Sequence, residues 1–289
     1  MSECILPIEL PSDVDSRARL LLDAIKKIKG SPVKHKPDSE NISAHWDLRD
    51  REKAKNEIML AVRNNLKRFN EKDIEKRHWN AIVITGAAGS GKTRLCNESF
   101  GWIDTELKGS VLQALSVFIT FLNGEQLTSA DSISGVGIST QASIAVGIRV
   151  ASKLFPILRL CESMTLRSLR EGLGDSQLLC ELPTVMRACS FHLEAQKNKL
   201  PVWVTMALDE THFAEHPEEI GAPQFWPSMM SAIMQYVIPG ADRALCVDDN
   251  VVLFPIISST WSSERQKHHW STGNKIFALL PPLSADSVA

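Results

Sequence analysis

The chain has 289 residues, of which 44% are hydrophobic and 23% are charged, and its formal net charge is −2 at pH 7. This length is enough for one large domain with an accessory segment, or for two small domains. Binding to a nucleic-acid backbone needs a concentrated excess of lysine and arginine, so the overall charge gives no reason to expect it. No apolar run reaches the roughly 18 to 20 residues that cross a bilayer, which predicts a soluble protein without membrane contact.

The cysteines and the first residues favour an intracellular protein. Six cysteines are scattered without a C-x-x-C pair, which predicts neither a disulfide framework nor a thiolate zinc site. The opening MSECILPIELPSD lacks the basic start and the sustained apolar stretch of a secretory signal peptide. We therefore expect a protein of the reducing intracellular environment.

The first predicted element is an amphipathic helix, which Ser12 would cap and which would run to about Lys29. Residues 30–41, GSPVKHKPDSEN, have no periodicity and are typical of a linker. We therefore divide the chain into residues 1–41, an N-terminal helical appendage with its linker, and residues 42–289, the main domain.

The main domain is predicted to be an α/β fold with a mostly parallel sheet and flanking helices. After a second amphipathic helix, from Arg51 to Phe69, short apolar runs alternate with helical stretches. This alternation is the pattern of parallel strands joined by crossover helices. The predicted strands are 81–85, 117–122, 202–208, 251–257 and 276–280. Between Ser129 and Arg170 the sequence is largely helical, but no periodicity fixes the helix bounds.

The most specific motif is AIVITGAAGSGKT at residues 81–93, an apolar run followed by the spacing G-x-x-x-x-G-K-[ST]. Its glycines let consecutive backbone N–H groups point at phosphate oxygens, and the following helix adds its positive N-terminal dipole. Lys92 would supply charge to the β- and γ-phosphates, and the Thr93 hydroxyl would bind Mg²⁺. We therefore predict a site for ATP and Mg²⁺. The predicted nucleotide-binding residues are Gly86, Ala87, Ala88, Gly89, Ser90, Gly91, Lys92, Thr93 and Arg94.

The second half of this site is predicted at the acidic end of another apolar run, ALDETH. Asp209 would orient a water molecule in the Mg²⁺ shell, while the adjacent Glu210 would polarise the attacking water as general base. Glu210 and Lys92 are thus the predicted catalytic residues, and Thr93 and Asp209 the predicted metal residues. The alternative is that the two acids only cap a following helix.

The run VVLFPIISST is expected to lie between the phosphate-loop strand and the Asp209 strand, and its end carries three hydroxyl residues beginning at Ser258. Ser259 or Thr260 is the predicted sensor of the γ-phosphate, although a hydroxyl-rich turn is an equal alternative. Arg243 and Arg265 are candidates for the cation that stabilises the transition state, but solvated surface arginines are the better interpretation.

The segment HWDLRDRE, residues 45–52, precedes the phosphate loop at a distance that suits a cover over the base. Trp46, Arg49 or Arg51 would then stack on adenine. The more ordinary interpretation is the capped start of the second helix, at one of its aspartates.

Two other motifs compete with this interpretation. The segment HFAEH matches the H-x-x-E-H pattern of inverted zinc proteases, but Pro217 disfavours the helix that would bring His212 and His216 to one face. We therefore expect no catalytic zinc. The string DETH resembles the DExH box of helicases, yet only residues 261–289 remain for the second RecA-like domain that a helicase needs.

Taken together, ITGAAGSGKTR, SVFITFLNGE, ALDETH and PIISSTW followed by FALLPPLS resemble the P-loop ATPase domain of Crinkler and retrotransposon-hot-spot type proteins, over residues 45–285. The residues that carry over are Gly86, Lys92, Thr93, Asp209 and Glu210. In that family the ATPase is often joined to a nuclease-like domain, and Crinkler members are secreted effectors that reach the host nucleus. This chain has no LxLFLAK-type segment and ends soon after Leu283, so neither DNA cleavage nor host targeting carries over, and C-terminal truncation of the ATPase domain stays an open alternative.

The sequence thus predicts a RecA/AAA-like P-loop ATPase that converts ATP hydrolysis into a conformational change in a protein partner or a missing domain. Two alternatives are a nucleotide-dependent binding switch with negligible turnover and a DExH-like helicase or translocase fragment. A kinase is a further option, since a phosphate loop alone does not separate transfer to water from transfer to another acceptor. An oligomer is compatible with each of these, and nucleic acid enters only through the family resemblance.

Overall fold

The computed structural model describes residues 10–28, 51–73, 75, 78–86, 89–121, 126–163, 165–193, 200–211, 224–237, 250–260 and 274–280. Their α-helices are α1 (Val14–Lys27), α2 (Glu52–Glu71), α3 (Lys92–Leu107), α4 (Ile138–Ile157), α5 (Leu166–Leu173), α6 (Leu182–His192) and α8 (Phe225–Val237). Two 3-10 helices are η3 (Ser129–Asp131) and η4 (Gly174–Cys180). The strands are β1 (Asn80–Gly86), β2 (Gln113–Thr120), β3 (Val202–Asp209), β4 (Val251–Thr260) and β5 (Asn274–Leu279).

Within the described residues, the five strands form one parallel sheet in the order β2-β3-β4-β1-β5. Each strand predicted from an apolar run is present, so the parallel α/β sheet is confirmed. β4 pairs with β1 on one side and with β3 on the other, as its sequence predicted. The arrangement is compatible with a Rossmann-like or RecA-like fold.

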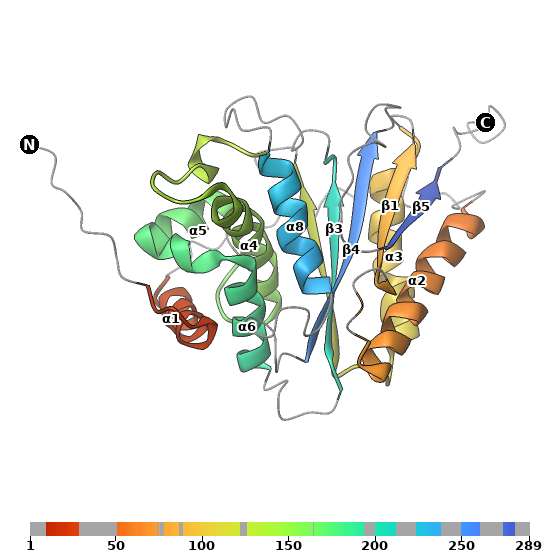
Figure 1. Ribbon diagram of the computed structural model, residues 1–289, viewed down its shortest axis with the longest axis horizontal. Helices are drawn as coiled ribbons and strands as arrows, with labels where there is room; N and C mark the ends of the chain where they lie inside the picture. The colour runs from red at the N-terminus through yellow and green to blue at the C-terminus, as the bar shows by residue number, and fades with distance from the viewer. Residues whose placement is uncertain are drawn as a thin grey trace, which may run out of the picture.

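The central strands read as continuous apolar runs because helices cover the sheet on both faces. β3 is buried along its whole length, and a strand buried on both faces has no polar side to show in its sequence. In Figure 1, helices α1, α4, α5, α6 and α8 lie on one face of the sheet, and α2 and α3 lie on the other. The sheet is therefore the middle layer of three.

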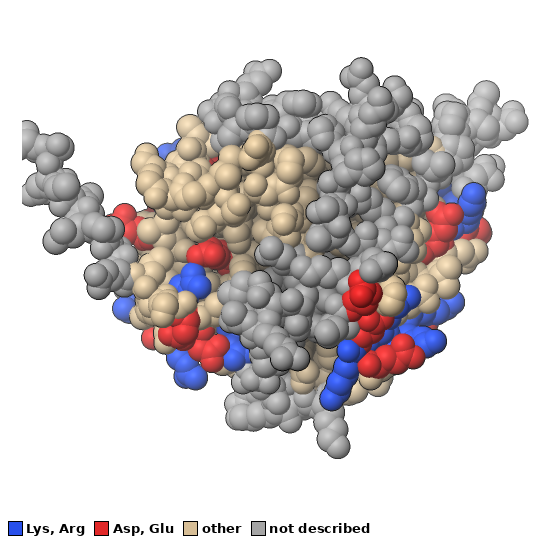
Figure 2. Space-filling model, in the orientation of Figure 1, with Lys and Arg blue, Asp and Glu red and all other residues tan. Residues whose placement is uncertain are grey.

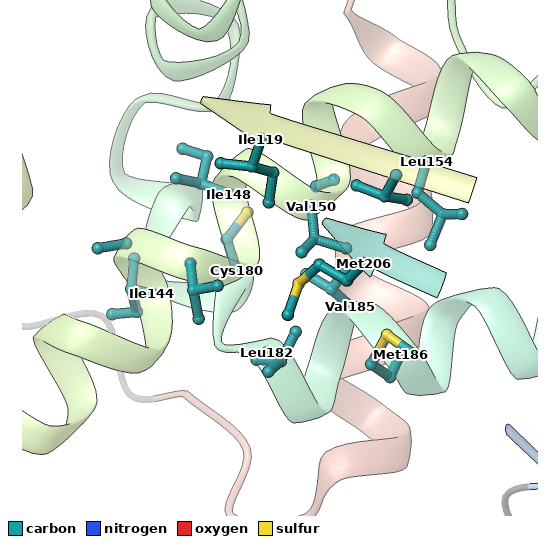
Figure 3. Close-up of a cluster of buried hydrophobic side chains, with 14 of the residues drawn as sticks. Ile119, Ile144, Ile148, Val150, Leu154, Cys180, Leu182, Val185, Met186 and Met206 are labelled. Atoms are coloured by element: carbon teal, nitrogen blue, oxygen red, sulfur yellow. The ribbon is translucent and has the colours of Figure 1, made fainter. Parts of the chain in front are cut away.

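The larger apolar core lies between the sheet and the five-helix layer. Figure 3 shows side chains of β2 and β3 meeting those of α4 and α6. Members of this cluster that are buried include Ile119, Met206, Ile148, Val150, Leu154, Val185 and Met186. Because α4 is buried on nearly every side, it lacks the polar face that gives a helix its sequence periodicity. This explains why the sequence from Ser129 to Arg170 did not define helix bounds.

The N-terminal helix α1 packs into the same core. Ala18 and Leu21 are fully buried members of the larger cluster, and Arg187 of α6 pairs with Asp15 at 2.7 Å. The predicted cap at Ser12 is wrong, because Asp13 is the N-cap and its carboxylate accepts from the Ser16 N–H. Ser and Asp are equally good caps, so propensity could not choose between neighbouring positions.

The described surface carries charges of both signs. On the face shown in Figure 2, the coloured Lys and Arg side chains are interspersed with Asp and Glu, so the described residues there form no broad basic area of the kind that binds a nucleic-acid backbone. Among the helices of the described segments, none combines the length and the apolar character needed to span a membrane.

Candidate functional site

The candidate site begins with the loop between β1 and α3, whose conformation requires glycine. Gly89 and Gly91 have φ angles of 75° and 83°, a region that glycine adopts without the clash of a side chain. At Gly86 an added Cβ would lie 2.6 Å from the Ser90 Oγ and 3.1 Å from the Leu280 carbonyl oxygen. The loop therefore curls too tightly for a side chain at its first position. Ala87 and Ala88 lie outside the described residues.

The start of α3 presents unused hydrogen-bonding groups to this loop. Its N-cap, Gly91, provides no side-chain cap, and no acidic residue stands in its first turn. The Ser90 hydroxyl is buried and has no hydrogen-bond partner in the described structure. Backbone N–H groups and a positive dipole at a helix start attract anions, and phosphate is the common ligand of such a site.

Lys92, the first residue of α3, places its charge inside the loop. Its side chain is buried, and its Nζ lies 3.2 Å from the carbonyl oxygen of Gly86. A buried ammonium group needs polar partners, because water no longer solvates it. The arrangement holds a positive charge at the place where the loop closes on itself.

Asp209, at the end of β3, is joined to the loop by a direct hydrogen bond. The Thr93 hydroxyl donates to the Asp209 Oδ2 at 2.7 Å, and the Ser258 hydroxyl of β4 donates to the Oδ1. The structure therefore brings together the two residues that the sequence assigned to a metal. Because Thr93 uses its proton on Asp209, the lone pairs of its oxygen remain available to a cation.

Ser258 has a position that the sequence analysis did not assign. Ser259 and Thr260 were the predicted sensors; Ser259 is half-buried, and the side chain of Thr260 lies outside the described residues. Ser258 instead is fully buried and holds Asp209. The available signal was a hydroxyl at the end of the strand beside the acidic strand, but only the register between β3 and β4 selects which hydroxyl it is.

Cys96 lies near Asp209 and Ser258, one helical turn after Lys92 on the buried side of α3. Burial raises the pKa of its thiol well above the usual value, and the negative charge of Asp209 raises it further, while a hydrogen bond with Ser258 lowers it. The thiol is therefore protonated at neutral pH. A neutral thiol packs beneath the carboxylate without adding a second negative charge.

Glu210 follows Asp209 in a backbone conformation that is uncommon outside glycine. Its φ angle is 56°, and the next residue, Thr211, donates both its N–H and its hydroxyl to the Ser258 carbonyl at 3.1 Å. Contacts with β4 thus stabilise the turn that carries Glu210. Such strain in non-glycine residues is concentrated at functional sites.

Among the described residues, the structure does not connect the remaining predicted ones to Thr93 and Asp209. Arg94 lies in the first turn of α3, and its Nε is 2.7 Å from the Glu98 carboxylate. Five other candidates lie outside the described residues, and so does the segment HFAEH. Together with Ala88, already mentioned, these are Trp46, Arg49, Arg243 and Arg265.

No protein-family model matches this chain, and no curated protein matches it either. The resemblance to Crinkler and retrotransposon-hot-spot type ATPases therefore stays a prediction.

Proposed function

We propose that this chain is a RecA/AAA-like P-loop protein that binds ATP with Mg²⁺ and hydrolyses it. The observation that supports this most is the hydrogen bond from Thr93 to Asp209, at 2.7 Å. It joins a glycine loop at a helix start to a buried carboxylate on another strand. An anion site and a cation site thus lie side by side, as a magnesium–phosphate ligand requires.

The binding roles follow from what each group can donate. The loop N–H groups, the Ser90 hydroxyl and the Lys92 ammonium are donors suited to phosphate oxygens. The Thr93 hydroxyl and the Asp209 carboxylate offer oxygen ligands to the Mg²⁺ shell, the carboxylate through water. The chemistry that Mg²⁺ supplies when bound is neutralisation of charge on the phosphates.

Hydrolysis adds a role for Glu210, which stands one residue beyond the metal-holding acid. Its carboxylate would take a proton from the water that attacks the γ-phosphate, and release that proton after phosphate leaves. The turn fixed by Thr211 and Ser258 supports this role, because a general base must keep its geometry. Turnover would then drive a conformational change in a partner.

Calorimetric titration with ATP and Mg²⁺ tests the binding claim. Lys92→Ala should weaken ATP binding at least about tenfold, because a hydrogen bond to a charged group contributes about 1.5 to 3 kcal/mol. Lys108→Ala, an exposed lysine at the other end of α3, is the matched control and should bind as the unmutated chain does. Equal ATP affinity in all three proteins would reject the phosphate site.

The binding switch is the alternative that the same site could serve. Binding is supported by three hydrogen bonds that connect β1, α3, β3 and β4, whereas the base for turnover rests on Glu210 alone. An ATPase assay of the unmutated chain, with and without DNA, separates the two. Tight ATP binding without turnover would favour the switch, and DNA-stimulated turnover would favour a translocase.

A further inference from the structure

We propose that Arg51 is a positioning residue of the phosphate loop, so that the N-terminus of α2 is part of the nucleotide site. This inference rests on the proposed function and extends it to a residue outside the loop motif. The guanidinium would hold the loop in its phosphate-binding shape before any ligand arrives.

The contact that carries the inference joins the N-terminus of α2 to the loop. Arg51 has a relative exposure of 4%, and its Nη2 donates a hydrogen bond to the carbonyl oxygen of Ser90. The same nitrogen lies 3.7 Å from the place where a Cβ on Gly91 would be. The guanidinium thus packs directly against the peptide that links Ser90 to Gly91.

Holding that carbonyl also aims the neighbouring N–H group. A trans peptide unit is planar, and its C=O and N–H bonds point in opposite directions. When Arg51 fixes the Ser90 carbonyl on its own side, the Gly91 N–H must point to the other side. A hydrogen-bonded carbonyl also polarises the peptide, which makes that N–H a better donor to a phosphate oxygen.

Arg51 occupies a position that α2 itself does not favour. It is the N-cap of α2 and makes no side-chain cap hydrogen bond, although Ser, Asp, Asn or Thr would provide one. Its positive charge also stands at the positive end of the helix dipole. A residue that departs from local preference at a helix start, while its head group is buried elsewhere, is typical of a functional position.

Stacking on adenine is the other role that the sequence allowed for Arg51, and the two roles can be separated. A residue that shapes the loop affects every ligand that has phosphates, whether or not it has a base. A residue that stacks on adenine affects only ligands that carry the base. Tripolyphosphate, which keeps the phosphates of ATP without the nucleoside, is therefore the discriminating probe.

The experiment measures calorimetric affinities for Mg²⁺–ATP and for Mg²⁺–tripolyphosphate in four proteins. These are the unmutated chain, Arg51→Ala, Arg51→Lys and the control Arg63→Ala, whose exposed side chain on α2 pairs with Glu106 of α3. Arg51→Ala should weaken both ligands by the same factor, about tenfold. Arg51→Lys keeps a cationic donor and should weaken both by a smaller, again equal, factor. Arg63→Ala should bind both as the unmutated chain does.

The outcomes distinguish failure of the Arg51 proposal from failure of the proposed ATP-binding function. Unchanged affinity in Arg51→Ala, while the unmutated chain binds both ligands, overturns the positioning role alone. Loss for ATP but not for tripolyphosphate assigns Arg51 to the base and also overturns it. Failure of the unmutated chain to bind either ligand overturns the proposed function and this inference together. If Arg51→Ala does not fold, the equality of the two factors in Arg51→Lys decides.

Discussion

Asp131 and Asp209 are both buried, but their partners differ in kind. Arg149 grips the Asp131 carboxylate with both of its Nη atoms, at 2.7 and 3.0 Å, and Arg170 adds a further ion pair. Asp209 instead receives hydrogen bonds from the hydroxyls of Thr93 and Ser258. Guanidinium groups neutralise a carboxylate permanently, whereas hydroxyls orient it and leave its charge in place. The first arrangement builds structure, and the second leaves a charge that a metal ion can use.

The Asp131 cluster fastens the segment after β2 to two helices. Arg149 of α4 also donates to the Gln126 carbonyl at 2.8 Å and lies 5.8 Å from the ring centre of Phe121. Burial raises the pKa of the Asp131 carboxyl, but the charge and hydrogen bonds of Arg149 and the charge of Arg170 outweigh it and hold that pKa below its ordinary value. This aspartate is therefore ionised in the folded protein.

The largest expected effect comes from removing the structural aspartate. Asp131→Ala should lower the free energy of unfolding by about 3 to 5 kcal/mol, because Arg149 would remain buried without its counter-charge. Chemical denaturation measures the loss, with the exposed Asp104→Ala as control. A loss below about 1 kcal/mol would mean that the cluster does not hold the fold together.

Glu210→Gln should affect turnover alone. It keeps the size and polarity of the side chain but removes the base, so ATP hydrolysis should fall by about 10²-fold or more while ATP stays bound. Single-turnover hydrolysis and calorimetric affinity, measured on one preparation, separate the two quantities. Hydrolysis at the unmutated rate would remove Glu210 from the mechanism.

Asp209→Asn should separate metal binding from stability. The amide is isosteric with the carboxylate but uncharged, so we expect Mg²⁺-dependent ATP affinity to fall about 10- to 100-fold, with little change in the unfolding midpoint. Titrations with and without Mg²⁺ measure the effect. The reverse pattern, a large loss of stability with Mg²⁺ dependence intact, would make Asp209 a second structural aspartate.

Ser258→Ala should have a milder effect of the same kind. It removes one of the two hydroxyls that orient Asp209, and loss of a residue that orients a metal ligand weakens metal affinity by about tenfold or more. Mg²⁺ titration of ATP binding is the measurement. Ser259→Ala is the matched control on the next residue; a larger effect there would return the predicted sensor role to Ser259.

The smallest effect is a dependence on pH. Since the Asp131 pKa is lowered on folding, its carboxylate stabilises the protein above the unfolded-state pKa of about 4, and this contribution is lost as pH falls toward the lower folded-state value. The difference in unfolding free energy between the unmutated chain and Asp131→Asn should therefore be constant near neutrality. It should shrink below about pH 4. A difference that grows in acid would contradict the lowered pKa.

The sequence predicted those parts of the molecule in which residue type and spacing alone set the chemistry. The central strands were visible because burial on both faces forces them to be apolar, and the glycine loop after β1 was visible because only glycine fits its curl. The neighbourhood of Thr93 and Asp209 followed from parallel strands ending at one edge of the sheet.

Other parts depend on register and on distant contacts that no local pattern encodes. Ser258 could not be chosen over its neighbour without knowing how β4 aligns with β3. Arg51 was only one of three candidates for stacking on adenine, and its contact with Ser90 was not predicted because it joins two elements that are separate in sequence. The bounds of α4 were hidden because a helix buried all round has no polar face.

The insertion of β4 between β1 and β3 has a consequence for the order of folding. Strands β1 and β3 are both synthesised before β4. They do not pair with each other, and β4 (Val251–Thr260) is the strand that connects them in the sheet. Until β4 pairs with them, each would expose an unpaired edge, and closing such long chain segments makes parallel sheets slow to form. During synthesis on the ribosome, the sheet would therefore stay incomplete until β4 has been made. We expect affinity for nucleotide to emerge only after β4 has paired with β1 and β3, so that a nascent chain lacking β4 would have no working site.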